Sequence, residues 1–263
     1  MSSDNFSSPP HNDEEDWMTT APDADLPGMM VQRAESRTPA PSGPSGGDAV
    51  QPVQVRDSSG LVRLLPTAVP GRRVLLGIVG APGAGKSTVA ATLASLNPAG
   101  HKQVPMDGFH LADQALIGLG LLDRKGAPET FDAHGYAALL SRLRGAPGHT
   151  VYAPAFERDL EQPLANALPI PASASMLITE GNYLLLDAPG WREARAQLDE
   201  VWFLDVEPDV RRRRLIARHI LFGKEPAAAQ EWVRQVDEPN AALVNATRAS
   251  ADRILDVSDW TMA

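Results

Sequence analysis

The chain reads Gly80-Ala81-Pro82-Gly83-Ala84-Gly85-Lys86-Ser87 between an apolar run at Val74–Val79 and a helix-like segment that begins at Thr88. This is the pattern G-x-x-x-x-G-K-S in the strand–loop–helix context that it requires. Glycines let successive backbone N–H groups face an anion, and the following helix adds the positive end of its dipole. Residues 80–88 are therefore predicted to bind nucleotide phosphates, with Lys86 on the β and γ phosphates and Ser87 on Mg²⁺. A chance glycine-rich turn is the alternative, and the flanking elements disfavour it.

Bulk composition limits the classes to which the chain can belong. Of its 263 residues, 43% are hydrophobic and 22% are charged, which allows a sizeable core. The net charge of −9 argues against a nucleic-acid partner, and the absence of cysteine excludes disulfides and thiolate zinc sites. The first residues do not resemble a signal peptide, and no apolar run approaches the roughly 20 residues that cross a bilayer. We expect a cytoplasmic protein without a membrane span.

Residues 1–65 differ in composition from the rest of the chain. They carry the acidic run Asp13–Asp16 and a Pro/Ser/Gly-rich stretch over 39–47, and few apolar residues recur at any period. Such a segment buries too little apolar surface to offset the entropy of ordering. We predict a disordered acidic tail over 1–65 and a folded domain over 66–263. Short docking elements at Trp17-Met18 and Met29–Val31 are the alternative within the tail, whose partner is unknown.

From about Val69 short apolar strands alternate with helical segments. Strands are predicted at 74–79, 103–106, 150–152, 175–179, 201–204 and 254–257. Helices are predicted at 87–96, 112–117, 133–143, 191–197, 208–219, 227–236 and 241–250. This alternation is typical of βαβ units and predicts an α/β fold, with a mostly parallel five-stranded sheet covered by helices. A small hairpin near 164–171 is expected outside the main sheet.

A carboxylate, Asp107, follows the second predicted strand in the sequence Val104–His110. The carboxyl ends of strands line the ligand crevice of an open parallel sheet, so Asp107 is predicted to face the γ phosphate. Phosphoryl transfer needs mainly positioning, charge neutralisation and one carboxylate that orients the nucleophile. A turn residue before Gly108 is the alternative, because Asp-Gly is a common turn dipeptide.

The chain resembles the phosphoribulokinase/uridine kinase family of P-loop kinases, which includes a bacterial type of pantothenate kinase. Four segments of the chain are similar to motifs of the family. Asp107–Phe109 matches its Asp-Gly-Phe, and Arg124–Asp132 is similar to its Lys-Gly-x-Pro-Glu-x-aromatic-Asp. Ala153–Phe156 is similar to its Ala-Pro-x-Tyr, and Leu177–Tyr183 to its apolar strand that ends in Glu-Gly. The core is most similar to a bacterial branch often labelled nucleoside/nucleotide kinase or fructose-transport-system kinase. The resemblance covers about residue 72 to the C-terminus and implies the P-loop kinase fold.

The resemblance implies roles for two carboxylates. Asp107 corresponds to the catalytic base and lies near the metal. Glu180 ends an apolar strand and corresponds to the acid that holds Mg²⁺ directly or through water. Mg²⁺ suits such a site because it keeps several waters and takes only one or two carboxylates besides phosphate. An exposed acid at a strand end is the alternative for Glu180.

An arginine-rich segment follows the strand predicted at 201–204. Arg211, Arg214 and Arg218 are spaced to share one face of the helix predicted there. In the resembling kinases this position is a lid, whose arginines close over the phosphates and neutralise charge in the transition state. A solvated helix face is the alternative, and the sequence does not decide which arginine is essential.

The residues that would bind the acceptor are less well defined. Arg124 and Lys125 are predicted to anchor an anionic or hydroxyl-rich acceptor, and His110, Phe156, Arg158 and Asn182 are further candidates. Solvated loop charges and a structural histidine are the alternatives. Phe156 replaces the tyrosine of the resembling enzymes, and Glu157-Arg158 replaces their Ser-His. Because polar groups discriminate between substrates better than apolar walls, these changes disfavour both pantothenate and uridine.

These observations predict an ATP-dependent kinase that transfers the γ phosphate to a hydroxyl of a small metabolite. A nucleoside or a sugar-like alcohol is the first choice of acceptor. Pantothenate is the second choice within this class. A regulatory NTPase or nucleotide switch is a different class that stays open, as does an accessory protein that acts through the tail. The sequence lacks the Asn-Lys-x-Asp guanine reader of G-proteins. The sequence does not decide whether ATP or GTP is the preferred nucleotide, and it leaves open whether the protein is a homodimer.

Overall fold

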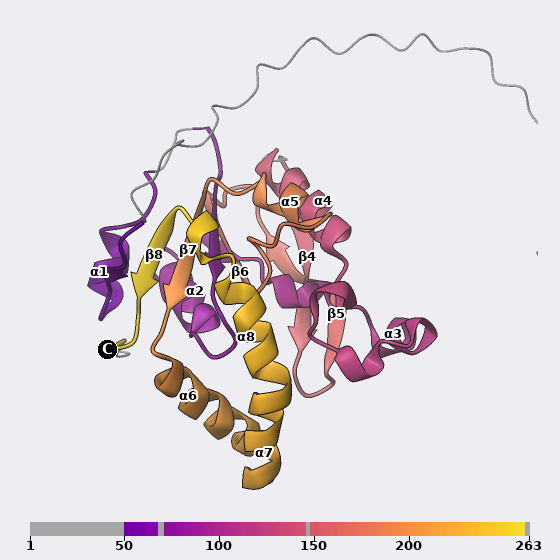
Figure 1. Ribbon diagram of the computed structural model, residues 1–263. Coiled ribbons are helices and arrows are strands. Elements are labelled where there is room, and N and C mark those ends of the chain that lie inside the picture. Colours follow the sequence, from indigo (N-terminus) through magenta and orange to yellow (C-terminus); the bar gives the residue numbers. More distant parts are fainter. Residues whose placement is uncertain (1–49, 68–70, 146–147, 261–263) are drawn as a thin grey trace, which may run out of the picture. The chain divides into compact units, whose positions relative to one another are not determined.

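The structure, a computed structural model, describes residues 50–67, 71–145 and 148–260 (Figure 1). Six strands form its main sheet, and every neighbouring pair is parallel. In spatial order they are β1 (Val53–Gln54), β8 (Arg253–Asp256), β7 (Glu200–Asp205), β2 (Val74–Val79), β6 (Met176–Gly181) and β3 (His101–Gln103). β2 and β6 are buried along their whole length because helices cover both faces of the sheet.

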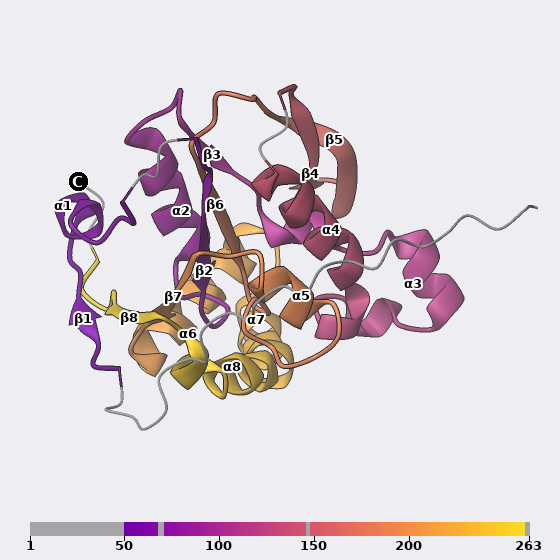
Figure 2. The same cartoon turned by 90° about the horizontal axis from the view of Figure 1, so that it is seen from above.

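The two faces of the sheet have separate apolar cores. In β2, Leu75 packs in a core shared with Tyr136 and Trp191, whereas Leu76 packs in one shared with Leu93. Alternate residues of a strand point to opposite faces, which explains this division. The first core contains side chains from α4 (Ala133–Arg144), α5 (Trp191–Arg195) and α8 (Glu238–Asn245). The second contains side chains from α1 (Ser58–Val62) and α2 (Lys86–Ser95), and Figure 2 shows α2 and α4 on opposite sides of the sheet.

A hairpin lies outside the main sheet, but it is longer than the one predicted near 164–171, because those residues belong mostly to its second strand. It joins β4 (Val151–Glu157) to β5 (Gln162–Ile170) in antiparallel pairing, so the strand expected at 150–152 belongs to this hairpin. The hairpin packs on a 3₁₀ turn, η1 (Met106–Phe109), that follows β3. A Cβ at Gly108 would lie 2.6 Å from the Pro154 carbonyl oxygen. Gly108 is therefore needed for close packing, and Asp107 lies in the turn rather than directly after the strand.

Residues 50–65, which the sequence prediction places in the tail, contain β1 and α1 in the structure. β1 pairs with β8, and the Asp57 side chain caps α1 by accepting a hydrogen bond from the Gly60 N–H at 3.0 Å. Val55 and Leu61 are fully buried in the second core. The main sheet consequently has six strands instead of five. Residues 1–49 of the tail predicted over 1–65, with Trp17-Met18 and Met29–Val31, lie outside the described residues.

The C-terminal helices also differ from the prediction. After α6 (Pro208–Leu221), α7 (Pro226–Trp232) continues through a π-helical turn, Val233–Asp237, directly into α8. Pro239 explains the turn, because a proline inside a helix lacks an N–H and clashes with the carbonyl four residues earlier. The wider π turn relieves that clash. A short helix, α3 (Asp113–Leu119), lies in the segment between β3 and α4.

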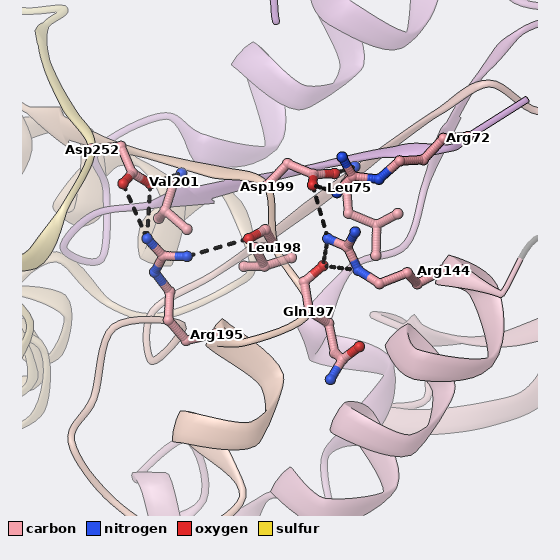
Figure 3. Close-up of polar contacts among 9 residues, drawn as sticks. All are labelled: Arg72, Leu75, Arg144, Arg195, Gln197, Leu198, Asp199, Val201 and Asp252. Atoms are coloured by element: carbon pink, nitrogen blue, oxygen red, sulfur yellow. Dashed lines mark hydrogen bonds and ion pairs between the residues drawn. The ribbon is translucent and has the colours of Figure 1, made fainter. Parts of the chain in front are cut away.

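Two carboxylates fix the amino ends of the central strands (Figure 3). Asp199 accepts hydrogen bonds from the Leu75 N–H at 2.8 Å and pairs with Arg144 at 3.1 Å. Asp252 accepts from the Val201 N–H at 2.6 Å and pairs with Arg195 at 2.9 Å. Each acid satisfies an N–H at the start of β2 or β7. The glycine-rich loop follows β2 at the opposite, carboxyl edge of the sheet.

Arg73 is expected to be a major contributor to stability. Its side chain is 2% exposed and donates to four carbonyl oxygens, those of Ala174 (2.9 Å), Leu143 (3.1 Å), Pro171 (2.8 Å) and Ala172 (3.1 Å). Arg73→Met removes these four buried hydrogen bonds and should lower the free energy of unfolding by about 2–4 kcal/mol in urea titrations.

Arg72→Met is the matched control, because Arg72 is half-exposed in an ion pair with Asp199. It should cost about 1 kcal/mol or less. An equal loss in the two variants contradicts the role assigned to Arg73.

Candidate active site

The glycine-rich loop has the backbone geometry of a phosphate-binding loop. Gly83 and Gly85 adopt φ angles of +82° and +90°, in the left-handed region that favours glycine. A Cβ at Gly83 would also lie 2.8 Å from Cγ of Leu215 on α6, so the loop and α6 pack closely. Lys86 begins α2, and its Nζ donates to the Gly80 carbonyl oxygen at 2.9 Å and to that of Ala81 at 3.3 Å. The loop's own carbonyls thus hold the ammonium beside the turn.

Three further groups lie close to Lys86. The Ser87 hydroxyl donates to Oε1 of Glu180 at 3.2 Å, and Glu180, near the end of β6, is only 8% exposed. Burial is the main reason that the pKa of Glu180 rises to about 7, and Asp107 adds to the rise. Burial also lowers the pKa of Lys86 to about 8, against the attraction of Glu180 and Asp107. The structure therefore brings together the residues that the sequence assigned to phosphate and metal.

These groups form a donor set that suits Mg²⁺. A hydroxyl from Ser87 and carboxylates from Glu180 and Asp107 are the hard oxygen ligands that this ion prefers. Mg²⁺ usually takes few protein ligands and completes its shell with phosphate oxygens and water. Within residues 50–67, 71–145 and 148–260, no cluster of three or more His, Asp or Glu side chains is arranged to hold a metal by itself. The site fits a metal that arrives with a nucleotide.

Glu180→Gln should stabilise the protein without nucleotide or divalent cations. The unfolded chain ionises this carboxyl near its usual pKa of 4.5, whereas the folded protein ionises it near 7. Stability is therefore lost as the pH rises from about 4.5 to about 7 and stays low above that range. Removing the charge should raise the free energy of unfolding at pH 8 by about 1–3 kcal/mol and leave it little changed at pH 4.5.

Urea unfolding at both pH values measures this effect. Glu225→Gln serves as the control because Glu225 is exposed at the start of α7. Its effect should stay within about 0.5 kcal/mol. A Glu180→Gln variant that is less stable than the wild type at pH 8 contradicts the burial of an ionised carboxylate.

Asp107 faces a cation from the hairpin. Its Oδ2 lies 3.3 Å from Nη2 of Arg158, which follows β4, and the side chains are 29% and 50% exposed. Arg158 also lies close enough to lower the pKa of Glu180. This ion pair joins two residues that the sequence analysis assigned separately to catalysis and to the acceptor. No sequence pattern predicts it, because the two residues are on different elements.

His110 forms an aromatic wall beside Asp107. Its ring centroid lies 4.0 Å from that of Phe131 and 4.7 Å from that of Phe156. Burial lowers the pKa of His110 below 6.5, so the ring is neutral near pH 7. Nδ1 lies 2.8 Å from the Asp107 carbonyl oxygen. Because that oxygen only accepts, Nδ1 carries the proton and Nε2 keeps a lone pair.

The other predicted acceptor residues differ in their contacts. Lys125 lies 5.7 Å from the Phe156 ring centroid and pairs with Asp113 at 2.7 Å. Arg124 is more exposed and pairs with Glu129 at 2.5 Å. Asn182 directly follows β6 and is half-buried beside Tyr183.

The three arginines of α6 have different surroundings. Arg211 is 4% exposed, donates to the Pro82 carbonyl oxygen at 3.2 Å and pairs with Glu238 of α8. It therefore connects the loop to two helices. Arg218 is exposed and close enough to lower the pKa of Lys86. The lid roles of all three stay predictions, and this geometry favours Arg218 over Arg211 for contact with phosphate.

Arg214 lines a cavity of about 310 Å³ together with Trp260 and Thr88. The Nε1 of Trp260 is buried and has no hydrogen-bond partner among the described residues. The sequence analysis missed Trp260 and Glu238. A single aromatic after the last strand and an acid in a helix carry no pattern that distinguishes them.

The chain is similar to several known proteins. It is 33% identical over 185 residues to a candidate uridine kinase of Schizosaccharomyces pombe, covering 67% of this chain and 77% of that protein. It is 32% identical to the uncharacterized protein YggC of Escherichia coli, over 76% of this chain and 84% of that one. A candidate fructose transport system kinase from Silicibacter sp. TM1040 has a similar crystal structure, with 38% identity and a TM-score of 0.65. That match covers 75% of this chain and 96% of the other.

The chain belongs to the phosphoribulokinase/uridine kinase family of P-loop kinases. No protein-family model matches it. The P-loop kinase fold and the family predicted from the sequence are confirmed. No helix within the described residues is both long and apolar enough to cross a membrane.

Proposed function

We propose that the protein is an ATP-dependent kinase that transfers the γ phosphate to a hydroxyl of a small metabolite. The observation that carries the proposal is the meeting of Lys86, Ser87, Glu180 and Asp107 at the carboxyl edge of one sheet. A nucleoside or sugar-like alcohol is the first choice of acceptor. Names of relatives that mention ATP-dependent, uridine or pantothenate kinases support the class but not one acceptor.

Each residue has a defined task in this reaction. Lys86 leaves the carbonyls of Gly80 and Ala81 and binds the β and γ phosphates. Ser87 and Glu180 hold Mg²⁺, which supplies charge neutralisation at the phosphates when it is bound. Asp107 accepts the proton of the acceptor hydroxyl as that oxygen bonds to the γ phosphorus. The bond from the γ phosphorus to the bridging oxygen breaks, which leaves ADP and a phosphate monoester.

The remaining site residues orient the two substrates. The adenine is assigned to the cavity that Arg214 and Trp260 line, because it adjoins Thr88 at the end of the phosphate-binding segment. A buried indole N–H without a protein partner suits a base that offers acceptor nitrogens. On the acceptor side, Nε2 of neutral His110 can accept a hydrogen bond from a second hydroxyl.

Two alternative functions are less well supported. A pantothenate kinase of Streptococcus pyogenes is 32% identical, but over only 42% of this chain and 37% of that one. Phe156 and Arg158 depart from the pattern that the resemblance implies for such enzymes. A regulatory NTPase needs no acceptor, and the aromatic wall beside Asp107 disfavours it. A cytoplasmic location and a homodimer stay predictions.

ADP release from Mg·ATP tests the proposal. The full chain is assayed with nucleosides, pentoses, hexoses and pantothenate, each against a reaction without acceptor. An acceptor that raises the rate well above this control supports the kinase and names its substrate. Equal release in every reaction favours the NTPase and contradicts the proposed transfer.

A further inference from the structure

The hairpin presents an aromatic ring and a guanidinium to the same turn of the chain. Phe156 and Arg158 are two residues apart at the end of β4, and they contact His110 and Asp107 respectively. Both contacts are on η1 or directly after it. The acceptor side of the site therefore combines tilted aromatic rings with a nearby cation. Lys125 lies 5.7 Å from the Phe156 ring centroid, and its charge is paired with Asp113.

The ion pair between Arg158 and Asp107 conflicts with the proposed chemistry. Asp107 is to receive the proton of the acceptor hydroxyl, yet its Oδ2 already contacts Nη2 of Arg158 at 3.3 Å. While this contact lasts, a guanidinium occupies the Oδ2 atom of Asp107 that would otherwise face the acceptor hydroxyl. The pair is half-exposed, so it contributes little to stability and separates at small cost. The reactive complex therefore needs another partner for Arg158.

The phosphates of ATP are already provided for by other cations. Lys86 is in the loop, and Arg214 and Arg218 belong to α6. Arg158 instead comes from the hairpin, which packs on η1. Only one hydrogen bond from its guanidinium is found within the described residues, which leaves donors for a planar anion. An oxyanion on the acceptor satisfies these donors in a bidentate arrangement.

We propose that the acceptor of this kinase carries an oxyanion, a carboxylate or a phosphate, and that Arg158 binds this group and in doing so leaves Asp107 free to act. The inference rests on the proposed function and narrows its acceptor to an anionic alcohol. The carbon skeleton lies against Phe156 and His110, and the anion lies at the hairpin end. Binding of the correct acceptor thus completes the catalytic base, whereas a neutral analogue leaves it paired.

Matched pairs of alcohols that differ in one anionic group test this inference. The pairs are glycerol and D-glycerate for a carboxylate, and D-ribose and ribose 5-phosphate, or uridine and its 5′-monophosphate, for a phosphate. In at least one pair, the anionic member should have a kcat/KM for ADP release about 100-fold above that of the neutral member. The pair that responds identifies the source of the oxyanion.

Arg158→Gln should remove most of that preference. The KM of the anionic acceptor should rise about 100-fold, while the KM of ATP stays within about 3-fold. Arg158→Lys keeps the charge and should retain part of the preference, which a purely structural role does not predict. Arg192→Gln is the matched control, because Arg192 on α5 is about as exposed as Arg158 and also pairs with an aspartate, Asp187, and it should change neither constant.

The outcomes separate the inference from the function on which it rests. The inference is wrong if neutral members are preferred, or if Arg158→Gln raises the KM of both members of a pair equally. In either case the acceptor is not held by its charge, but the proposed kinase activity is unaffected. If Arg158→Gln raises the KM of ATP instead, Arg158 serves the nucleotide and the inference is wrong. If no alcohol raises ADP release above the reaction without acceptor, the proposed kinase and this inference are both contradicted.

Discussion

Asp107→Asn is expected to lower kcat by roughly 10²–10⁴-fold, which is the usual contribution of a positioned general base. Asparagine keeps the shape of the side chain but cannot take the proton of the acceptor hydroxyl. Its contact with Arg158, at 3.3 Å in the wild type, is half-exposed, so the fold should be kept. The interaction is proposed mainly for the transition state, so the KM of ATP should change little.

Steady-state ADP release with the acceptor found in the panel measures kcat and the KM of ATP separately. Asp123→Asn is the control, since Asp123 is an exposed acid in the loop that follows α3. An Asp107→Asn variant with wild-type kcat removes this residue from the chemistry. Loss of MgATP binding in a folded variant makes it chiefly a metal ligand.

Lys86→Met is expected to reduce turnover by about 10³-fold or more, because it removes a cation that faces the transferred phosphate. Methionine keeps most of the stem that fills the loop. Burial lowers the pKa of Lys86 to about 8, so the ammonium loses its proton as the pH rises through that value. ATP affinity of the wild type should therefore weaken above about pH 8, and the variant should lack this dependence.

Turnover and ATP titrations at pH 7 and pH 9, with thermal unfolding as a check of the fold, measure these effects. Lys102→Met is the matched control, because Lys102 also donates to a backbone carbonyl, that of Pro98 at 2.6 Å, but lies in β3 away from the loop. Retained turnover in Lys86→Met removes the loop from the mechanism. A pH dependence that persists in the variant assigns it to another group.

Local patterns predicted much of this protein. The loop at residues 80–87, its flanking strand and helix, and the family follow from short stretches that need no distant partner. The position of Glu180 near the end of a buried strand follows from an apolar run that stops at a charge. Such features depend on backbone propensity and periodicity, which neighbouring residues carry.

The errors arise where distant segments meet. The strand Val53–Gln54 is too short to show a period, and it forms because β8 offers an open edge to pair with. Its segment was therefore assigned to the tail. Helix α8 begins earlier than predicted because a π turn accommodates Pro239.

The amino-acid order alone is enough to recognise a phosphate-binding loop, a parallel sheet and a carboxylate at the end of β6, because each is encoded by adjacent residues. Folding alone brings Arg158 to Asp107, Glu238 to Arg211 and Trp260 to Arg214. These pairs join segments that are far apart in the chain, and their contacts depend on the packing of the hairpin and helices around the sheet. The acceptor preference is therefore expected to reside in the part of the site that tertiary packing creates.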